Sequence, residues 1–145
     1  MKKQPELSII ILCYRSEKQV LKFAQEVKES AEKLTDSFEI VLEANYIGGS
    51  GDQTKKYVEQ IAKGDKAFVV VSKPKEGMMG WDMRSGLEAT TGKNIAVIDG
   101  DGQMPCEDVI RVYRKLINER LELAKTYRVN REDGLYRKII STLYN

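Results

Sequence analysis

Short apolar segments alternate with amphipathic segments along this chain, and this alternation constrains the fold more than any other feature. The apolar segments are rich in Val and Ile, as strands buried on both faces are; they cover residues 7–13, 38–42, 67–71 and 94–98. Between them, apolar residues recur three and four positions apart, which is the spacing of an amphipathic helix. Four strand–helix alternations predict an α/β fold with a doubly wound, mostly parallel sheet and helices on both faces.

The same periodicity sets the expected elements and the number of domains. The chain has 145 residues, which is room for one domain, so we expect a single domain over residues 1–145. Residues 121–127 are a weaker strand candidate, and apolar residues from Gly134 onward predict a last amphipathic helix. The predicted helices cover residues 17–34, a segment from about 53, and residues 81–91 and 107–118.

Composition excludes several classes of function. The chain contains no histidine, which rules out His-based catalytic triads and His-ligated zinc within it. The net charge of +2 gives no electrostatic case for nucleic-acid binding. Cys13 and Cys106 are too few for a disulfide framework, so we expect a reducing compartment, the cytoplasm. Residues 108–145 hold nine basic and five acidic residues, and this net charge of +4 favours contact with phosphates or with the cytoplasmic face of a membrane.

Two carboxylates at the end of the fourth predicted strand are the strongest chemical signal. In parallel sheets, ligands bind beyond the carboxyl ends of the strands. Asp99 and Asp101 stand there in the sequence Asp-Gly-Asp-Gly-Gln, and the glycines let the backbone turn sharply. Paired carboxylates repel unless a cation lies between them, and hard oxygens suit Mg²⁺ or Mn²⁺ together with phosphate oxygens. Gln103 offers a third oxygen. The alternative is a polar turn that begins the next helix.

Five motifs occur in order along the chain. They are Leu7–Tyr14 with Glu17, Gly49-Ser-x-Asp52-x-Thr54, Arg84-Ser-Gly-Leu87 with Ala89-Thr-x-Gly92, Val97–Gln103 and Arg128–Arg137. Together they resemble family 2 glycosyltransferases of the GT-A fold, most of all the dolichyl- or polyprenyl-phosphate sugar synthases. The resemblance spans residues 7–145, and it implies that the chain is a catalytic core without further C-terminal elements.

The resemblance implies an inverting transfer of a sugar from a nucleotide diphosphate sugar to an acceptor, such as a polyprenyl phosphate. A divalent cation stabilises the departing diphosphate, and an acceptor phosphate is already nucleophilic, so no histidine base is required. By resemblance, Asp99, Asp101 and Gln103 hold Mg²⁺ or Mn²⁺, and Asp101 and Arg128 are catalytic. The substrate-binding residues that it implies are Tyr14, Glu17, Asn45, Asp82, Asp99 and Arg131.

The chain departs from the family pattern in its first two loops. Arg15 and Ser16 stand where the family has Asn and Glu, and Glu43-Ala-Asn45 replaces an Asp-Asp pair that meets the nucleoside. The identity of the donor base therefore stays open. The departures also keep a second hypothesis open, a non-catalytic nucleotide- or metal-binding module of the same fold.

Several residues have a structural interpretation beside the functional one. Asp52 is predicted to cap the helix that follows it rather than to bind substrate. Met78, Met79 and Trp81 are predicted to be core residues rather than an apolar wall beside the sugar or lipid. Asp82 is a donor contact or a helix cap, and Arg128, Arg131 and Arg137 are phosphate ligands or a solvated basic tail.

Overall fold

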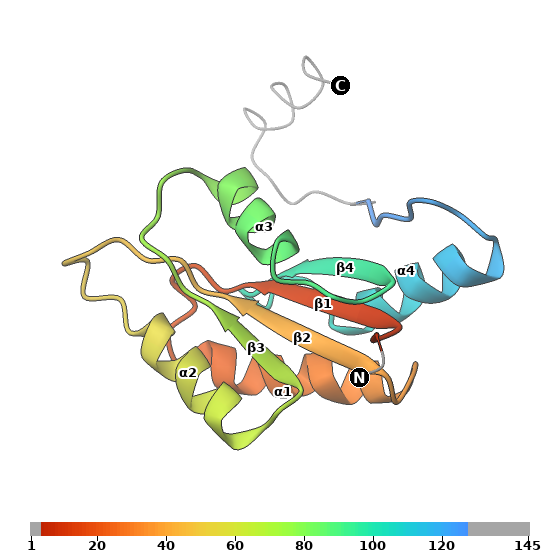
Figure 1. Ribbon diagram of the computed structural model, residues 1–145, viewed down its shortest axis with the longest axis horizontal. Coiled ribbons are helices and arrows are strands. Elements are labelled where there is room, and N and C mark those ends of the chain that lie inside the picture. Colours follow the sequence, from red (N-terminus) through yellow and green to blue (C-terminus); the bar gives the residue numbers. More distant parts are fainter. Residues whose placement is uncertain (1–3, 128–145) are drawn as a thin grey trace, which may run out of the picture.

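The sheet consists of four parallel strands, as the alternation predicts. The computed structural model describes residues 4–127. The strand order is β3-β2-β1-β4, so β1 and β2 are central and β4 lies at one edge of the described sheet (Figure 1). All three strand pairs are parallel. The strands are β1 (Leu7–Leu12), β2 (Phe38–Glu43), β3 (Phe68–Val71) and β4 (Asn94–Asp99).

Helices cover both faces of this sheet, which confirms the predicted fold class. Three of them pack against one face, and α3 lies on the other (Figure 1). The helices predicted within residues 4–127 all occur. One of them, α3, ends at Leu87 rather than near Thr91, whose N–H donates to Glu39 Oε1 at 2.6 Å. The helices are α1 (Gln19–Glu32), α2 (Thr54–Gly64), α3 (Met79–Leu87) and α4 (Glu107–Asn118).

The core is divided between the two faces by the alternation of side chains along each strand. In β1, Ile9 and Ile11 belong to the larger cluster with α1, α2 and α4, whereas Ile10 and Leu12 belong to the cluster on the α3 side. Every residue of β1 is buried. Burial of an Ile or Leu side chain stabilises a fold by roughly 1.5–3 kcal/mol. The continuous apolar run of β1 is therefore explained by the helices that cover both faces of the sheet.

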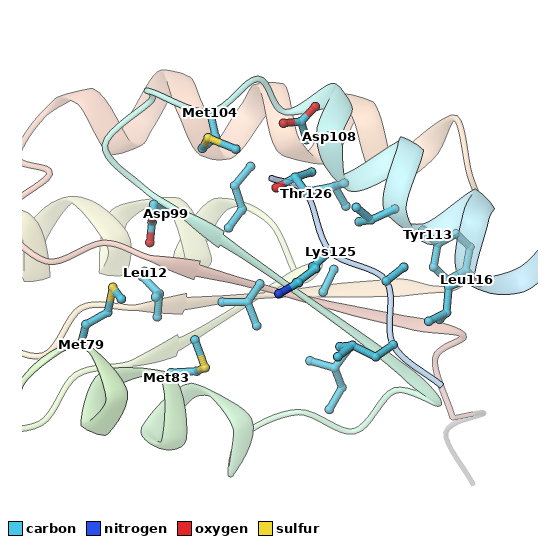
Figure 2. A pocket seen from close by; sticks show the side chains of 18 residues that line it. Leu12, Met79, Met83, Asp99, Met104, Asp108, Tyr113, Leu116, Lys125 and Thr126 are labelled. Carbon is cyan, nitrogen blue, oxygen red and sulfur yellow. The ribbon is translucent and has the colours of Figure 1, made fainter. Parts of the chain in front are cut away.

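The predicted strand at residues 121–127 is wrong. The structure has no strand there; the segment runs irregularly beside the helix α4 and the strand β4 (Figure 2). Leu123 and Tyr127 are both exposed, so the segment buries too little apolar surface to order a strand. The predicted helix from Gly134 lies outside the described residues.

Candidate functional site

The register of the sheet places the ends of the strands in one row. Leu12 of β1 pairs with Glu43 of β2 on one side and with Asp99 of β4 on the other. Their side chains point to the same face, that of α3, because paired residues of parallel strands share a face. Two strand spacings of about 4.8 Å put the backbones of Asp99 and Glu43 roughly 10 Å apart. This edge is the candidate site.

Asp99 and Asp101 are both exposed at this edge, on either side of Gly100. Asp99 lines an apolar pocket of about 480 Å³, next to Leu12 and Met79 (Figure 2). Asp101 lines a separate groove of about 550 Å³ that runs along α1. Its Oδ1 accepts the N–H of Gln103 at 2.9 Å, so the predicted polar turn is also present. The two carboxylates thus face different hollows.

The turn between the two carboxylates requires glycine. The Gly100 N–H donates to the Leu12 carbonyl oxygen at 2.8 Å. A Cβ at this position would lie 2.6 Å from the same oxygen, which is too close for any side chain. The Ser16 hydroxyl donates to the Gly100 carbonyl oxygen at 3.1 Å. The loop after β1 therefore holds the loop after β4.

The donor set at this edge fits a divalent cation in its chemistry. Mg²⁺ is commonly held by one or two carboxylates, with water and substrate phosphates completing its shell. Asp99 and Asp101 are exposed, and neither forms an ion pair within residues 4–127. The exposed side chain of Gln103 offers an amide oxygen beside them. Within the same residues, no group of three His, Cys, Asp or Glu side chains gathers around a point.

The loop after β1 is held in an unusual backbone conformation. Arg15 and Glu17 have φ values of +54° and +50°, in the left-handed region that costs a non-glycine residue roughly 1–2 kcal/mol. Contacts to the start of α2 offset this cost: the Glu17 N–H donates to Thr54 Oγ1 at 2.8 Å, and Glu17 Oε1 accepts the Gln53 N–H at 3.3 Å. In this structure Glu17 joins two loops at the site edge; its predicted contact with substrate stays a prediction.

The N-cap position of α2 is Gln53, one residue later than the predicted Asp52, and the Gln53 side chain forms no capping bond. Asp52 instead bonds the first residue of the helix. Its Oδ1 accepts the N–H of Thr54 at 2.9 Å and the hydroxyl of the same residue at 2.6 Å. Thr54 is the first residue of the helix, so this bond satisfies one of the amides that have no partner inside the helix.

Asn45 and Asp82 meet in a buried polar network on the α3 side of the sheet. Asn45 Nδ2 donates to Asp82 Oδ1 at 3.2 Å, and Asn45 Oδ1 accepts the Lys73 N–H at 2.8 Å. The second oxygen of Asp82 contacts Lys75 Nζ. That ammonium group lies 4.3 Å from the centre of the Tyr14 ring. Their predicted substrate contacts stay predictions, and each already has a protein partner.

Glu43 completes the network and is fully buried. Its Oε1 accepts the Asn45 N–H at 3.2 Å, while Oε2 has no hydrogen-bond partner among the described residues. The pKa of this carboxyl is raised from 4.5 to about 7, mainly because burial disfavours the charged form and also because Asp82 adds negative charge. The Asn45 N–H, Lys75 and Lys73 act in the opposite direction.

The core prediction for the methionines before Trp81 is wrong. Met78 is 82% exposed and Met79 is 59% exposed, whereas Trp81 is half-buried. These methionines stand at the N-terminal end of α3, where the helix begins at the open edge of the sheet. Met79 lines the same pocket as Asp99, so an apolar surface borders the exposed carboxylate (Figure 2).

Comparison with known proteins decides the family. A model of the family described as "Glycosyl transferase family 2" matches residues 8–145. The chain belongs to this family. It is 28% identical over 140 residues to an undecaprenyl-phosphate 4-deoxy-4-formamido-L-arabinose transferase of Pseudomonas syringae, covering 96% of this chain and 40% of the relative.

Other relatives have names of the same kind. A dodecaprenyl-phosphate galacturonate synthase of Rhizobium johnstonii is 28% identical over 145 residues, covering 97% of this chain and 41% of the relative. A second arabinose transferase, of Salmonella choleraesuis, is 24% identical over 140 residues, with 97% and 42% coverage. The chain spans about two fifths of the length of these relatives.

Some predicted features of this family 2 chain lie outside the described residues. These include Arg128, Arg131 and Arg137, together with the rest of residues 128–145 of the basic C-terminal segment. Within residues 4–127, no helix combines the length and apolarity that crossing a bilayer requires.

The structure also brings in two residues that sequence reasoning missed as members of the site, Glu43 and Lys75. Each looks like an ordinary charged loop or strand-end residue in sequence. Their place in the sequence could have identified them as site residues, because both follow the carboxyl ends of predicted strands.

Proposed function

We propose that this chain is the catalytic core of an inverting glycosyltransferase. It moves a sugar from a nucleotide diphosphate sugar to a polyprenyl phosphate, with Mg²⁺ or Mn²⁺ bound at Asp99, Asp101 and Gln103. The exposure of Asp99 and Asp101 on either side of Gly100, at the carboxyl edge of the sheet, is the observation that carries the proposal. The names of the relatives, an undecaprenyl-phosphate sugar transferase and a dodecaprenyl-phosphate sugar synthase, favour a polyprenyl phosphate as acceptor.

The residues at the carboxyl edge of the sheet have different roles in binding the cation. A bound divalent cation supplies positive charge against the diphosphate that leaves the sugar. Asp99 and Asp101 hold that cation, and Gln103 adds a neutral oxygen. The Asp101 side chain lines the groove along α1, so sharing one cation with Asp99 would require it to turn toward the Asp99 side.

Residues around these carboxylates bind the sugar donor and the acceptor phosphate. The exposed Tyr14 ring and the loop of Asn45 border the nucleoside end of the donor. Arg128 and Arg131 bind phosphate oxygens, because a guanidinium group matches their geometry. The acceptor phosphate is itself the nucleophile, so the chain needs no general base. The basic C-terminal segment rests on the cytoplasmic face of the membrane that carries the acceptor.

A second candidate is a module that binds nucleotide and metal without transfer. The observation in its favour is the changed composition of the first two loops, where Arg15 and Ser16 approach the edge in place of the family's Asn and Glu. Both candidates predict metal-dependent nucleotide binding, and only the first predicts transfer.

A transfer assay with the full chain separates the two candidates. A panel of nucleotide diphosphate sugars is incubated with a short polyprenyl phosphate and Mn²⁺, and the lipid-linked sugar is quantified. We expect product with one donor, and a loss on the order of 100-fold or more in Asp101→Asn. Asp36→Asn is the matched control and is expected to retain activity. Asp36 is exposed and precedes β2, whereas the candidate site lies at the carboxyl ends of the strands. Product formation that is unchanged in Asp101→Asn would contradict the proposed mechanism.

A further inference from the structure

Loops that follow three neighbouring strands meet around Asp82: two contact its carboxylate, and the third lies against Lys75, one of these contacts. Asn45, from the loop after β2, donates to Asp82 Oδ1 at 3.2 Å. Lys75, from the loop after β3, contacts the other oxygen and lies 4.3 Å from the ring of Tyr14, from the loop after β1. We call Tyr14, Glu43, Asn45, Lys75 and Asp82 the Asp82 network. Asp82 itself stands on α3, so this helix is the common anchor of all three loops.

Stability alone does not explain why polar groups occupy this place. The Lys75 and Asp82 side chains are 9% and 4% exposed. A buried ion pair loses so much hydration that apolar residues of similar volume are often as stable or more so. The neighbouring side chains on this face, such as Ile10 and Val41, are apolar, and an apolar residue at position 82 would extend their cluster.

Two further polar atoms are buried in the same region without a partner. Glu43 Oε2 and Ser85 Oγ have no hydrogen bond among the described residues. Gly86 packs directly on Glu43, since a Cβ there would lie 3.6 Å from Glu43 Cγ. Unsatisfied buried polar atoms are rare and destabilising, and those that persist commonly mark a functional constraint. Their gathering beneath α3 is a second, independent sign that this region is shaped by function.

The network lies beside the candidate metal carboxylate rather than elsewhere on the sheet. Glu43 and Asp99 both pair with Leu12, one from each side, and point to the α3 face. A change in the position of α3 or of Lys75 therefore moves Tyr14 and the Asn45 loop relative to Asp99. Those two loops border the nucleoside end of the proposed donor.

We infer that Asp82 is a positioning residue of the donor site, which holds the loops of Tyr14, Asn45 and Lys75 in the arrangement that binds the nucleotide. This inference rests on the proposed function. Asp82 acts through Lys75 and Asn45 and does not itself need to contact the donor. It fixes the loops before the donor arrives, so that binding does not have to order them.

Three variants separate a positioning role from a purely structural one. Asp82→Asn and Lys75→Met each leave one buried charge without its partner, whereas the double variant removes both charges. We expect each single variant to unfold at a lower temperature and to bind the donor nucleotide at least 10-fold more weakly in the presence of Mn²⁺. In the double variant we expect the unfolding temperature to return toward that of the wild type, while nucleotide binding stays at least 10-fold weaker.

A second ion pair of the same chemistry provides the matched control. Lys28 Nζ lies 2.7 Å from Asp65 Oδ2, between α1 and the end of α2, near the opposite edge of the sheet. Lys28→Met/Asp65→Asn is expected to bind nucleotide as the wild type does. Recovery of nucleotide affinity together with stability in the Lys75→Met/Asp82→Asn variant would overturn the inference, because the pair would then be structural only.

Hydrogen–deuterium exchange tests the loops without any nucleotide. In Lys75→Met/Asp82→Asn we expect amides in residues 13–17, 44–50 and 72–77 to exchange at least several-fold faster, with the Lys28 and Asp65 control unchanged. Wild-type exchange in all three loops would overturn the inference. If the wild-type chain binds no nucleotide, the proposed function fails, and the exchange result still decides whether Asp82 positions these loops.

Discussion

Two acidic regions stand at the same edge of the sheet and differ in what their charges touch. At the end of β4, Asp99 and Asp101 are exposed and form no ion pair within the described chain. Glu43 at the end of β2 and Asp82 on the covering helix α3 are buried, and Asp82 already has Lys75 and Asn45 as partners. The difference indicates a division of labour: the β4 end is open to a ligand, whereas the β2 end supports loops.

The largest effect is expected at the open region. Asp99→Asn should lower the rate of sugar transfer on the order of 1000-fold, equivalent to about 4 kcal/mol, because a neutral amide holds a divalent cation poorly. The unfolding temperature should stay unchanged, since the carboxylate is exposed and has no ion-pair partner among residues 4–127. Kinetics and thermal unfolding of the same preparation check this. A large loss of stability in Asp99→Asn would remove the contrast between the two regions.

In the buried region, the Glu43 carboxyl is expected to make the free energy of unfolding depend on pH. Glu43 retains its proton in the folded chain up to about pH 7, whereas in the unfolded chain it loses the proton near its ordinary pKa of 4.5. The folded state is therefore favoured at low pH, and this contribution is lost as the pH rises from about 4.5 to about 7. The full difference between these pKa values corresponds to about 3 kcal/mol.

Glu43→Gln isolates this contribution from those of other groups. The free energy of unfolding of the wild type relative to Glu43→Gln should fall by up to about 3 kcal/mol between pH 4 and pH 8, as measured by urea denaturation at each pH. Parallel pH profiles for the two proteins would mean that Glu43 is ionised in the folded chain at neutral pH, and would contradict the prediction.

Two glycines of the open region, Gly100 and Gly102, are expected to differ in how much an alanine destabilises the fold. Gly100→Ala should destabilise the fold by about 2 kcal/mol, because its Cβ would lie 2.6 Å from the Leu12 carbonyl oxygen. Gly102→Ala is the matched control: Gly102 has a φ of +71° but open space around it, so only about 1 kcal/mol of backbone strain is expected. Denaturant unfolding of both variants is the measurement. Equal losses would show that the close contact at Gly100 relaxes without cost.

Much of the fold could be predicted because its signals are local. The apolar runs of β1 and β2 and the helical spacing after them identify the elements within short windows of sequence. The prediction of a strand at residues 121–127 was wrong because a weak local apolar pattern does not reveal whether the segment can pair with a neighbouring strand. The exposure of Met78 and Met79 was missed for a related reason, since composition does not reveal where a helix begins relative to the sheet edge.

The candidate site could be predicted only in part. Asp99 and Asp101 were found because a motif and the end of a strand coincide. Tyr14, Asn45 and Asp82 were also singled out, but as substrate-binding residues. Their contacts within the protein were not predicted, because these join residues far apart in sequence: Asn45 and Asp82 are 37 positions apart. A buried lysine and aspartate also look like surface residues in a sequence, and only the three-dimensional arrangement pairs them.

The smallest effect is expected at Met78, the exposed residue that directly precedes α3. Met78→Ser should change the free energy of unfolding by less than about 0.5 kcal/mol, because the side chain is 82% exposed. Denaturant unfolding at neutral pH checks this value. A loss above about 1 kcal/mol would mean that the Met78 side chain is packed against the fold, in contradiction to its exposure.

Titration calorimetry tests the central claim, that the exposed carboxylates at the end of β4 bind a diphosphate through a divalent cation. UDP, GDP, CDP and TDP are each titrated into the wild-type chain, once with Mn²⁺ and once with a chelator. The account predicts that at least one nucleotide binds with Mn²⁺ and that its binding disappears when the metal is chelated. Absence of binding by all four nucleotides, or equal binding with and without the metal, would contradict it.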